Sequence, residues 1–541
     1  MAVLDLPPTT PERPSPGSVL AAVQERFASA VSVSPADKGL ALCFHVREPK
    51  SLPSLCRFLF WELGCPFGGL TIEEHPENWW LSYLFLAGGA GWISLILELP
   101  FGANTVPSVS AEVHAADWHE REGEDLFGLQ FENHPRLGDF VLHDQIWHEG
   151  VAPQRRGVDI HQFNFERRPN SEWRPLLVVQ DPGSFAMPVG PVYEGGLGES
   201  LHFILETVGE DVLRAVPRLF YKYRGVEKLA EGNAVSRALL LSERFAATSA
   251  FAHSLGFCAA VERICEAEVP ARARRLRVVL AELERLRHHA GAITGICEST
   301  ALAVAASQAA IIEEELLRAS CQFAGHRYLF GLNQPGGLRR DFQEEQVREL
   351  QRATKRAIDQ LRVLEDRLHF TSSFLDRLED VGVVSAEKAR DLNLVGPVGR
   401  ASGRGHDLRL ECTYSGYEEF KFEVPRESEG DGYARLRVLF REARESAGLI
   451  RQAVERLEPG PVCVRCEPSG AGAALGWAEA PIGAALHWVR LDRSGLVERY
   501  RAITPSFNNW LGFHVAVEDF AFQDFPIILA TFALSASECD R

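Results

Sequence analysis

The chain has 541 residues, of which 46% are hydrophobic and 24% charged, a composition that excludes a disordered, collagen-like or disulfide-scaffold protein. Its 57 lysines and arginines against 74 aspartates and glutamates give a net charge of −17, which repels phosphate backbones and argues against nucleic acid as a partner. Eleven cysteines, with only one Cys-x-x-Cys pair among them, indicate reduced thiols and a cytoplasmic location. The length predicts more than one domain.

The N-terminal part is expected to be an α+β domain over residues 19–150, preceded by a flexible, proline-rich leader over residues 1–18. Residues 41–46 predict a strand. The uncharged stretch 79–97 is long enough to be checked as a membrane span. Its central glycines favour two strands joined by a turn instead, namely Gly88, Gly89 and Gly91.

The C-terminal part, residues 188–541, is expected to be mainly α-helical and to follow a polar linker over residues 151–187. Leucines and valines between residues 271 and 290 recur on one side of a helix, with arginines and glutamates elsewhere. Residues 301–312 are apolar nearly all round, which predicts a helix buried within a bundle. Residues 344–378 show helical periodicity with a charged outer face.

Two segments carry more specific patterns. The first reads Trp118-His119-Glu120-Arg121-Glu122-Gly123-Glu124-Asp125-Leu126-Phe127-Gly128, followed by His134-Pro135-Arg136-Leu137. It resembles the signature of the small hydrophilic subunit of complex I, which packs beside the quinone-pocket subunit. The second comprises Gly190-Pro191-Val192, Gly209-Glu210-Asp211, Arg218-Leu219-Phe220-Tyr221 and Arg224-Gly225-Val226-Glu227-Lys228-Leu229. It resembles the opening of the large subunit of membrane-bound, energy-converting [NiFe] hydrogenases and of their complex I relative.

Further blocks resemble this family, in the same order, within residues 115–538. They include Glu282-Leu283-Glu284-Arg285-Leu286 with His289, Val395-Gly396-Pro397 with Arg400-Ala401-Ser402-Gly403, and Glu479-Ala480-Pro481. The fusion of both subunit-like parts in one chain resembles the large subunit of the formate hydrogenlyase-type, group 4 hydrogenases. The resemblance implies the fold as well, an α+β domain followed by a mainly α domain of the hydrogenase large-subunit type.

The family's [NiFe] centre is held by four cysteine thiolates, which come from two Cys-x-x-Cys pairs. The first pair belongs to a motif Arg-x-Cys-Gly-x-Cys-Gly-Phe-Ala-His-Ser, whose frame is present from Arg244 through His253 to Ser254. The two cysteine positions, however, hold Ala246 and Ser249. Alanine offers no donor atom, and a serine hydroxyl is a poor, hard ligand at neutral pH.

The second pair belongs to an Asp-Pro-Cys-x-x-Cys motif, and its cysteine positions hold Ser535 and Glu538. Cys539 lies one residue beyond, so a slip of register restores one thiolate at most. The arginine that the family places over the metals is replaced by Ile482, which supplies no cation. Glu199 matches the family's proton-carrying glutamate when one residue is inserted. The sequence therefore predicts that the metal site is lost and that the chain itself binds no cofactor.

The other cysteines give no replacement site. Cys463 and Cys466 form a Cys-x-x-Cys pair on strand-like sequence, and Cys258 and Cys265 share one face of a predicted helix. A structural zinc site needs a second such pair, and the chain has no other. We interpret these cysteines as small buried apolar residues, and predict no metal.

The leading hypothesis is a NADH dehydrogenase-like large subunit without nickel and iron, in a membrane-associated respiratory or energy-converting oxidoreductase complex. The resemblance implies an iron–sulfur small subunit and antiporter-like membrane subunits as partners, at the cytoplasmic face of the inner membrane. Candidate catalytic residues are Glu199, His253 and Glu538. Polar residues at the former metal site are candidates for contact with a proton or a quinone head, namely Ser249, His253, Ser535 and Glu538.

Two alternatives stay open. One is a quinone-reducing subunit like that of complex I, which needs an apolar tunnel ending in hydrogen-bond donors. Tyr193, Tyr221 and Tyr223 lie in the matching segment. The other is a scaffold subunit that only bridges its partners, so the sequence leaves open whether the chain is catalytic.

Overall fold

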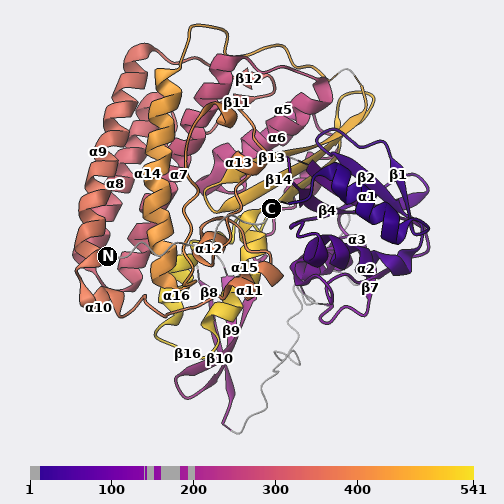
Figure 1. Ribbon diagram of the computed structural model, residues 1–541, viewed down its shortest axis with the longest axis horizontal. Helices are drawn as coiled ribbons and strands as arrows, with labels where there is room; N and C mark the ends of the chain where they lie inside the picture. The colour runs from indigo at the N-terminus through magenta and orange to yellow at the C-terminus, as the bar shows by residue number, and fades with distance from the viewer. Residues whose placement is uncertain are drawn as a thin grey trace.

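The computed structural model places the N-terminal domain beside a larger domain of helices and sheets (Figure 1). It describes residues 13–89, 91–138, 140–142, 151–159, 183–192, 201–468 and 470–541. The architecture confirms the predicted fold class, a mixed α/β domain followed by a mainly helical one. None of the helices in these ranges is long and apolar enough to cross a membrane.

A five-stranded sheet in the order β1-β2-β5-β4-β3 forms the N-terminal domain. Its strands are β1 (Val31–Ser34), β2 (Leu42–Val46), β3 (Phe67–Glu74), β4 (Asn78–Ala87) and β5 (Gly91–Pro100). Strands β4 and β5 pair antiparallel, which confirms the hairpin predicted over residues 79–97. The hairpin is buried along most of its length, because both of its faces are covered by protein.

The helices of this domain are α1 (Pro16–Phe27), α2 (Leu52–Arg57) and α3 (Asp117–Phe127), and a short parallel pair is made by β6 (Thr105–Pro107) and β7 (Gln130–Glu132). Helix α1 starts inside the segment predicted as a flexible leader. The Ser15 hydroxyl caps it by accepting the backbone N–H of Ser18 at 3.2 Å, and Pro16 suits the first turn. Residues 1–12 lie outside the described part of the chain.

A second sheet opens the C-terminal domain and projects at the bottom of Figure 1. It has the order β16-β10-β9-β8, built from β8 (Phe185–Val192), β9 (Leu201–Val208), β10 (Asp211–Arg218) and β16 (Phe520–Ala521). Of the predicted linker over residues 151–187, residues 160–182 lie outside the described ranges. Strand β8 begins before that linker was expected to end.

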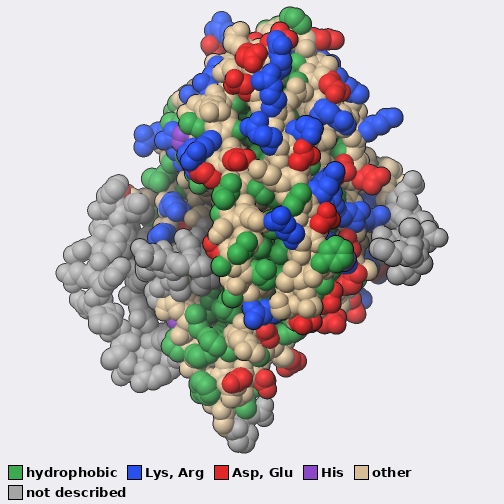
Figure 2. Space-filling model, turned by 90° about the vertical axis from the view of Figure 1, so that its left-hand side faces the viewer, with side chains coloured by type: hydrophobic (Ala, Val, Ile, Leu, Met, Phe, Trp, Pro, Cys, Tyr) green, Lys and Arg blue, Asp and Glu red, His purple; other side chains and the backbone are tan. Residues whose placement is uncertain are grey.

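Four long helices form a bundle, in which α7 packs against α8 and α14, and α9 packs against α8 and α14. They are α7 (Ala271–Ser299), α8 (Ala303–Ala324), α9 (Glu344–His369) and α14 (Gly432–Glu455). The prediction that residues 301–312 are buried all round is wrong. Val304 is 74% and Ile311 57% exposed, because α8 lies at the edge of the bundle and only one side of it is covered. The left-hand side of Figure 1 is seen face-on in Figure 2, where hydrophobic side chains lie among charged ones.

A third sheet, β13 (Gly472–Ala480), β14 (Gly483–Leu491) and β15 (Val497–Ile503), packs against α6 (Ala250–Cys265). Two glycines allow this close approach. A Cβ on Gly476 would lie 2.1 Å from the carbonyl oxygen of Gly256, and a Cβ on Gly256 would lie 2.5 Å from the ring of His487. The remaining helices are α4 (Val226–Ala230), α5 (Val235–Arg244), α10 (Ser372–Leu375), α11 (Ala386–Asp391), α12 (Gly396–Ala401), α13 (Leu408–Glu411), α15 (Pro505–Val517) and α16 (Phe525–Phe532).

Buried ion pairs join the two domains. Glu122 of α3 and Glu227 of α4 accept from Arg501 of β15 and from Arg541, with Arg541 Nη2 3.0 Å from Glu122 and its Nε 3.2 Å from Glu227. All four side chains are almost fully buried. Burial by itself would raise the pKa of Glu122, but the two guanidinium groups lower it to about 2. Both glutamates belong to motifs noted in the sequence, one from each resembled subunit.

We expect Gly476→Ala to destabilise the chain, because its methyl group would enter the backbone of α6. Overpacking of this kind costs about 1–3 kcal/mol. Chemical denaturation should show the loss as a lower midpoint. The matched control is Gly448→Ala in α14, where nothing lies within 4 Å and alanine should be neutral or stabilising. Equal midpoints for the two variants would contradict the close approach.

Candidate functional site

Two segments from distant parts of the chain meet inside the C-terminal domain. One is the 3₁₀ turn Ala247–Ser249, which leads from α5 into α6, and the other follows α16 through Ser535 to Glu538. The Ser249 hydroxyl donates a hydrogen bond to Glu538 at 2.5 Å, and both residues are fully buried. Ala246 is 1% exposed and Ser535 4%. The structure thus places both predicted ligand segments at one buried site.

A row of hydrogen-bonded side chains leads away from Glu538. His253 Nε2 lies 3.3 Å from Glu538, His253 Nδ1 lies 3.2 Å from His487 Nε2, and His487 Nδ1 lies 2.9 Å from the Tyr500 hydroxyl. All four side chains are fully buried. The contacts are consistent when Tyr500 donates to His487, His487 to His253, and His253 to Glu538. Such a row can pass a proton between Tyr500 and Glu538 without moving a heavy atom.

The surroundings of Glu538 favour its carboxylate. Its second oxygen accepts the backbone N–H of Ser506 at 3.0 Å, in the first turn of α15, where the helix dipole favours negative charge. Burial by itself would raise the pKa of Glu538, but His253, Ser249 and Ser506 hold it below its usual value. Burial lowers the pKa of His487 well below its usual range, so this imidazole is neutral.

These residues do not fit a nickel–iron centre. Ala246 has no donor atom, and the Ser249 hydroxyl is already hydrogen-bonded to Glu538. Both oxygens of Glu538 accept hydrogen bonds from the protein itself. The thiol of Cys539 is buried in the hydrophobic core, 4.0 Å from the Ser535 carbonyl oxygen. The side chains of Ser249 and Glu538 satisfy each other at these positions.

Other predicted positions lie elsewhere. Ile482, at the former arginine position, is buried in the turn between β13 and β14, and Glu199 lies outside the described residues. Cys463 and Cys466 lie in an irregular segment rather than on the strand that was predicted, and Cys466 contacts Cys265 at the end of α6. Within the described ranges no group of three or more His, Cys, Asp or Glu side chains is placed to hold a metal ion.

Blocks of the resemblance also meet at a second buried place, between α7, α14 and the end of β13. It contains Glu282, Arg285, His289, Arg400 and Glu479, all noted from the sequence. Three more members were not anticipated, namely Asp407, Arg409 and Glu442. No local pattern marks those three, because each is a common charged residue in a sequence that reads as ordinary helix or loop.

Two of the tyrosines considered for a quinone lie within the described residues, Tyr221 and Tyr223. The Tyr221 hydroxyl is 3.2 Å from His202 Nδ1, beside the sheet that projects at the bottom of Figure 1. Tyr223 is hydrogen-bonded to Gln154 at 3.2 Å, and burial raises its pKa. Tyr193 lies outside the described residues. The first two tyrosines therefore occupy different environments, of which only that of Tyr221 includes a histidine.

Comparison with known families matches two separate parts of the chain. Residues 45–164 match the family "Respiratory-chain NADH dehydrogenase, 30 Kd subunit", and residues 308–470 match "Respiratory-chain NADH dehydrogenase, 49 Kd subunit". Among solved structures, a chain of the membrane-bound sulfane sulfur reductase, an archaeal respiratory membrane complex, superimposes with a TM-score of 0.63 and 26% identity. The match covers 67% of this chain and 100% of that one.

Individual relatives match this chain over different lengths. Formate hydrogenlyase subunit 5 of Escherichia coli is 30% identical over 91% of this chain and 87% of its own length. Hydrogenase-4 component G of the same organism is 28% identical over 83% of this chain and 78% of its own length. NADH-quinone oxidoreductase subunit 4 of Thermus thermophilus is 36% identical over 51% of this chain and 67% of its own length.

We expect Glu538→Gln to cost about 1–3 kcal/mol of stability at pH 7. Both carboxylate oxygens accept hydrogen bonds, and the glutamine NH₂ group would face one of these donors with no hydrogen bond possible. The pKa of Glu538 is lower in the folded state than in the unfolded state. Its carboxylate therefore contributes fully to stability above about pH 4.5, and this contribution is lost as the pH falls through the folded-state pKa. Urea unfolding at pH 7 and at about pH 4 should show the difference shrinking in acid. The exposed Glu349→Gln is the control, and a loss independent of pH would contradict this assignment.

Proposed function

We propose that this chain is a large subunit without nickel and iron in a membrane-associated oxidoreductase complex. The premise is that the chain belongs to the family of fused 30 kDa-type and 49 kDa-type subunits that includes formate hydrogenlyase subunit 5. In this proposal an iron–sulfur cluster in a small partner subunit supplies the electrons. Antiporter-like membrane subunits lie beneath, and the chain is peripheral on the cytoplasmic face of the inner membrane.

One observation carries the proposal: Ser249 and Glu538, at two of the four predicted ligand positions, belong to a closed hydrogen-bonded unit. Ser249 and His253 both reach the same oxygen of Glu538, and Ser506 reaches the other. Binding two metal ions here would require these bonds to break and the buried carboxylate to lose its partners. That cost would have to be offset by ligands that the site does not offer, since Ala246 and Ile482 carry no donor.

The same unit supports a role in proton movement. The row from Tyr500 through His487 and His253 to Glu538 is buried, continuous and composed of groups that exchange protons. We propose that it carries a proton between the former metal site and the interior of the domain when the neighbouring cluster changes its redox state. No redox step is assigned to the chain itself, because none of these groups is an electron carrier.

A quinone-reducing role is the second candidate, and the pair of Tyr221 and His202 favours it. A phenol and an imidazole 3.2 Å apart are the donors that a quinone head group needs. His202 lies on β9 of the projecting sheet (Figure 1), and Tyr221 lies in the turn that follows β10. A scaffold without any catalytic role would use neither the pair nor the proton row.

We expect the complex purified with this chain to contain far less than one nickel atom per chain and to take up no hydrogen with an artificial electron acceptor. The reason is that the ligand positions hold alanine, two serines and a glutamate. Elemental analysis by mass spectrometry measures the nickel, with a [NiFe] hydrogenase prepared in parallel as the positive control. Stoichiometric nickel that disappears in Ser249→Ala and Glu538→Ala would refute the proposal.

The two candidate roles separate in a quinone assay on the same complex. Inhibitor-sensitive reduction of a soluble quinone that is lost in Tyr221→Phe would establish the quinone-reducing role. Tyr433→Phe is the matched control, since Tyr433 is hydrogen-bonded to His369 at 2.9 Å far along the chain from this sheet. No reduction at all, with the complex still assembled, would leave the proton row or the scaffold as the function.

A further inference from the structure

Eight ionisable side chains, each at most 2% exposed, form one network inside the C-terminal domain. The members are Glu282, Arg285, His289, Arg400, Asp407, Arg409, Glu442 and Glu479. They come from α7, α14, β13 and the segment that carries α12 and α13. None of them belongs to the row around Glu538, so the function proposed above leaves this network unexplained.

One end of the network surrounds Glu282. Its carboxylate is 3.0 Å from Arg409 Nη1 and 3.3 Å from Arg285 Nε, and it also accepts hydrogen bonds from the hydroxyls of Tyr417 and Ser446 at 2.6 and 2.7 Å. Burial by itself would raise the pKa of Glu282, but the two guanidinium groups lower it. Glu282 is therefore a well-paired carboxylate that stays ionised.

The other end is organised by Arg400. This side chain makes ion pairs with Glu442 at 2.6 Å, with Asp407 at 2.9 Å and with Glu479. Asp407 has a second partner in Arg409 at 2.6 Å, and Glu442 has one in His289 at 2.9 Å. Glu479 has no second cationic partner within ion-pair distance among the described residues, and its other oxygen accepts only the Leu408 N–H at 3.1 Å.

Charge in the network does not balance. Four carboxylates face three guanidinium groups, those of Arg285, Arg400 and Arg409. Burial lowers the pKa of His289 although Glu442 opposes the shift, so this imidazole adds no positive charge at neutral pH. One carboxylate would remain uncompensated in a fully buried site, which is among the costliest arrangements in a protein. Holding one proton removes the excess.

We propose that the network stores one proton on Glu479 and exchanges it with solvent through a cavity between the two domains. The step is a proton transfer only. The O–H bond of the Glu479 carboxyl breaks, its electron pair stays on the carboxylate, and the proton passes to water in the cavity and on to the surface. This site goes beyond the proposed function, since it depends neither on the metal content nor on the partners of the chain.

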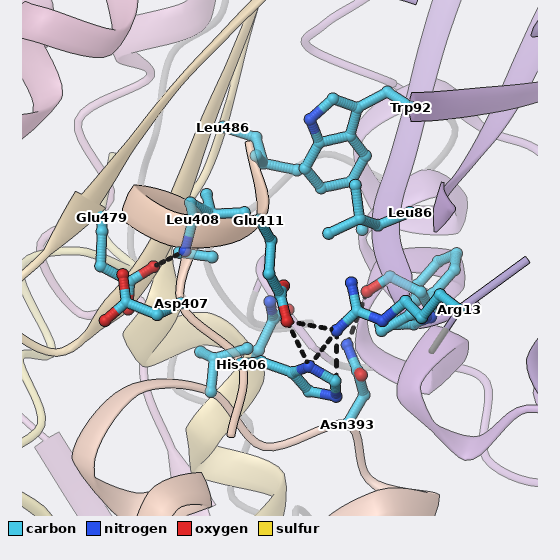
Figure 3. Close-up of a pocket in the computed structure, with 16 residues that line it drawn as sticks. Arg13, Leu86, Trp92, Asn393, His406, Asp407, Leu408, Glu411, Glu479 and Leu486 are labelled. Carbon is cyan, nitrogen blue, oxygen red and sulfur yellow. Dashed lines mark hydrogen bonds and ion pairs between the residues drawn. The ribbon is translucent and has the colours of Figure 1, made fainter. Parts of the chain in front are cut away.

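The cavity provides the route. It has a volume of about 40 Å³, enough for a few water molecules, and both Glu479 and Asp407 lie on its wall. Figure 3 shows these two acids on one side and Arg13, His406 and Glu411 on another, with Trp92, Leu86 and Leu486 as an apolar roof. The residues come from both domains, so the cavity exists only where the domains are packed together.

Its outer wall reaches the solvent. His406 Nδ1 is 3.0 Å from Glu411, Arg13 is 2.8 Å from the same carboxylate, and Arg13 also contacts the His406 ring. The side chains of His406 and Glu411 keep 19% and 25% of their surface exposed. Burial, then the charge of Arg404, lowers the pKa of His406 to about 4, so the ring is a neutral donor and acceptor that can relay a proton.

The groups that face Glu479 act in opposite directions. Burial and the charge of Asp407 raise its pKa to about 7, although Arg400, Arg285 and Arg409 oppose the shift. Tyr414, whose hydroxyl accepts the Glu479 N–H at 2.8 Å, is kept neutral by burial, and the nearby thiol of Cys412 likewise has a raised pKa. Geometry and charge count thus point to the same residue.

Infrared titration of the full-length chain tests the proposal. Wild type and Glu479→Gln are compared from about pH 5 to about pH 9, and the difference should contain one protonated carboxyl C=O band that disappears around pH 7. The comparison is needed because burial raises the pKa of Glu120 and of Glu284 to about 7 as well. The exposed Glu349→Gln should give no such difference. A missing band, or one that does not change with pH, would overturn the proposal.

Thermal unfolding gives a second, independent reading. The folded-state pKa lies above the unfolded one, so protonation of Glu479 favours the fold in acid and this benefit is lost as the pH rises through about 7. Glutamine is the neutral isostere, so Glu479→Gln should fold, and its Tm relative to wild type should rise between about pH 5 and about pH 8. Failure of Glu479→Gln to fold, or a Tm difference independent of pH, would count against the stored proton.

Discussion

Arg501 and Arg541 neutralise Glu122 and Glu227 in the interior, and the packing of the two domains depends on these pairs. Buried carboxylates are tolerated only when cations and hydrogen bonds replace the lost water. Here the cations come from β15 and from the C-terminal segment, whereas the acids come from α3 and α4. The constraint therefore fixes four distant stretches of the chain at once, and with them the position of Glu538.

The site around Glu538 is consistent with the proposal that the domain has closed over a lost metal centre. Removing thiolates and metals from a packed interior leaves polar backbone and empty volume, both of which are costly. Ser249, Glu538 and His253 occupy that space and satisfy one another. The outcome is a polar interior rather than an apolar one, and it contains groups that hold protons.

Much of this arrangement was predictable from the sequence. The order of the motifs predicted the two-part fold, and the frame around His253 predicted that Ala246 and Ser249 stand at the first pair of ligand positions. The burial of α8 was predicted wrongly, because a run of alanines and isoleucines has the same pattern in a fully buried helix as in a helix at the edge of a bundle. The relay through His487 and Tyr500 was missed, since a single histidine and a single tyrosine on two strands carry no spacing signal.

The sequence by itself determined the class of fold and which residues stand at the motif positions, because the side chain at a motif position can be read locally. The tertiary structure alone decided which groups neutralise one another. Asp407, Arg409 and Glu442 acquire their roles only when α13 and α14 close on α7, and the excess of one acid over the guanidinium groups is a property of that assembly. Electrostatic energy depends on distances through space, and spacing along the chain does not fix them.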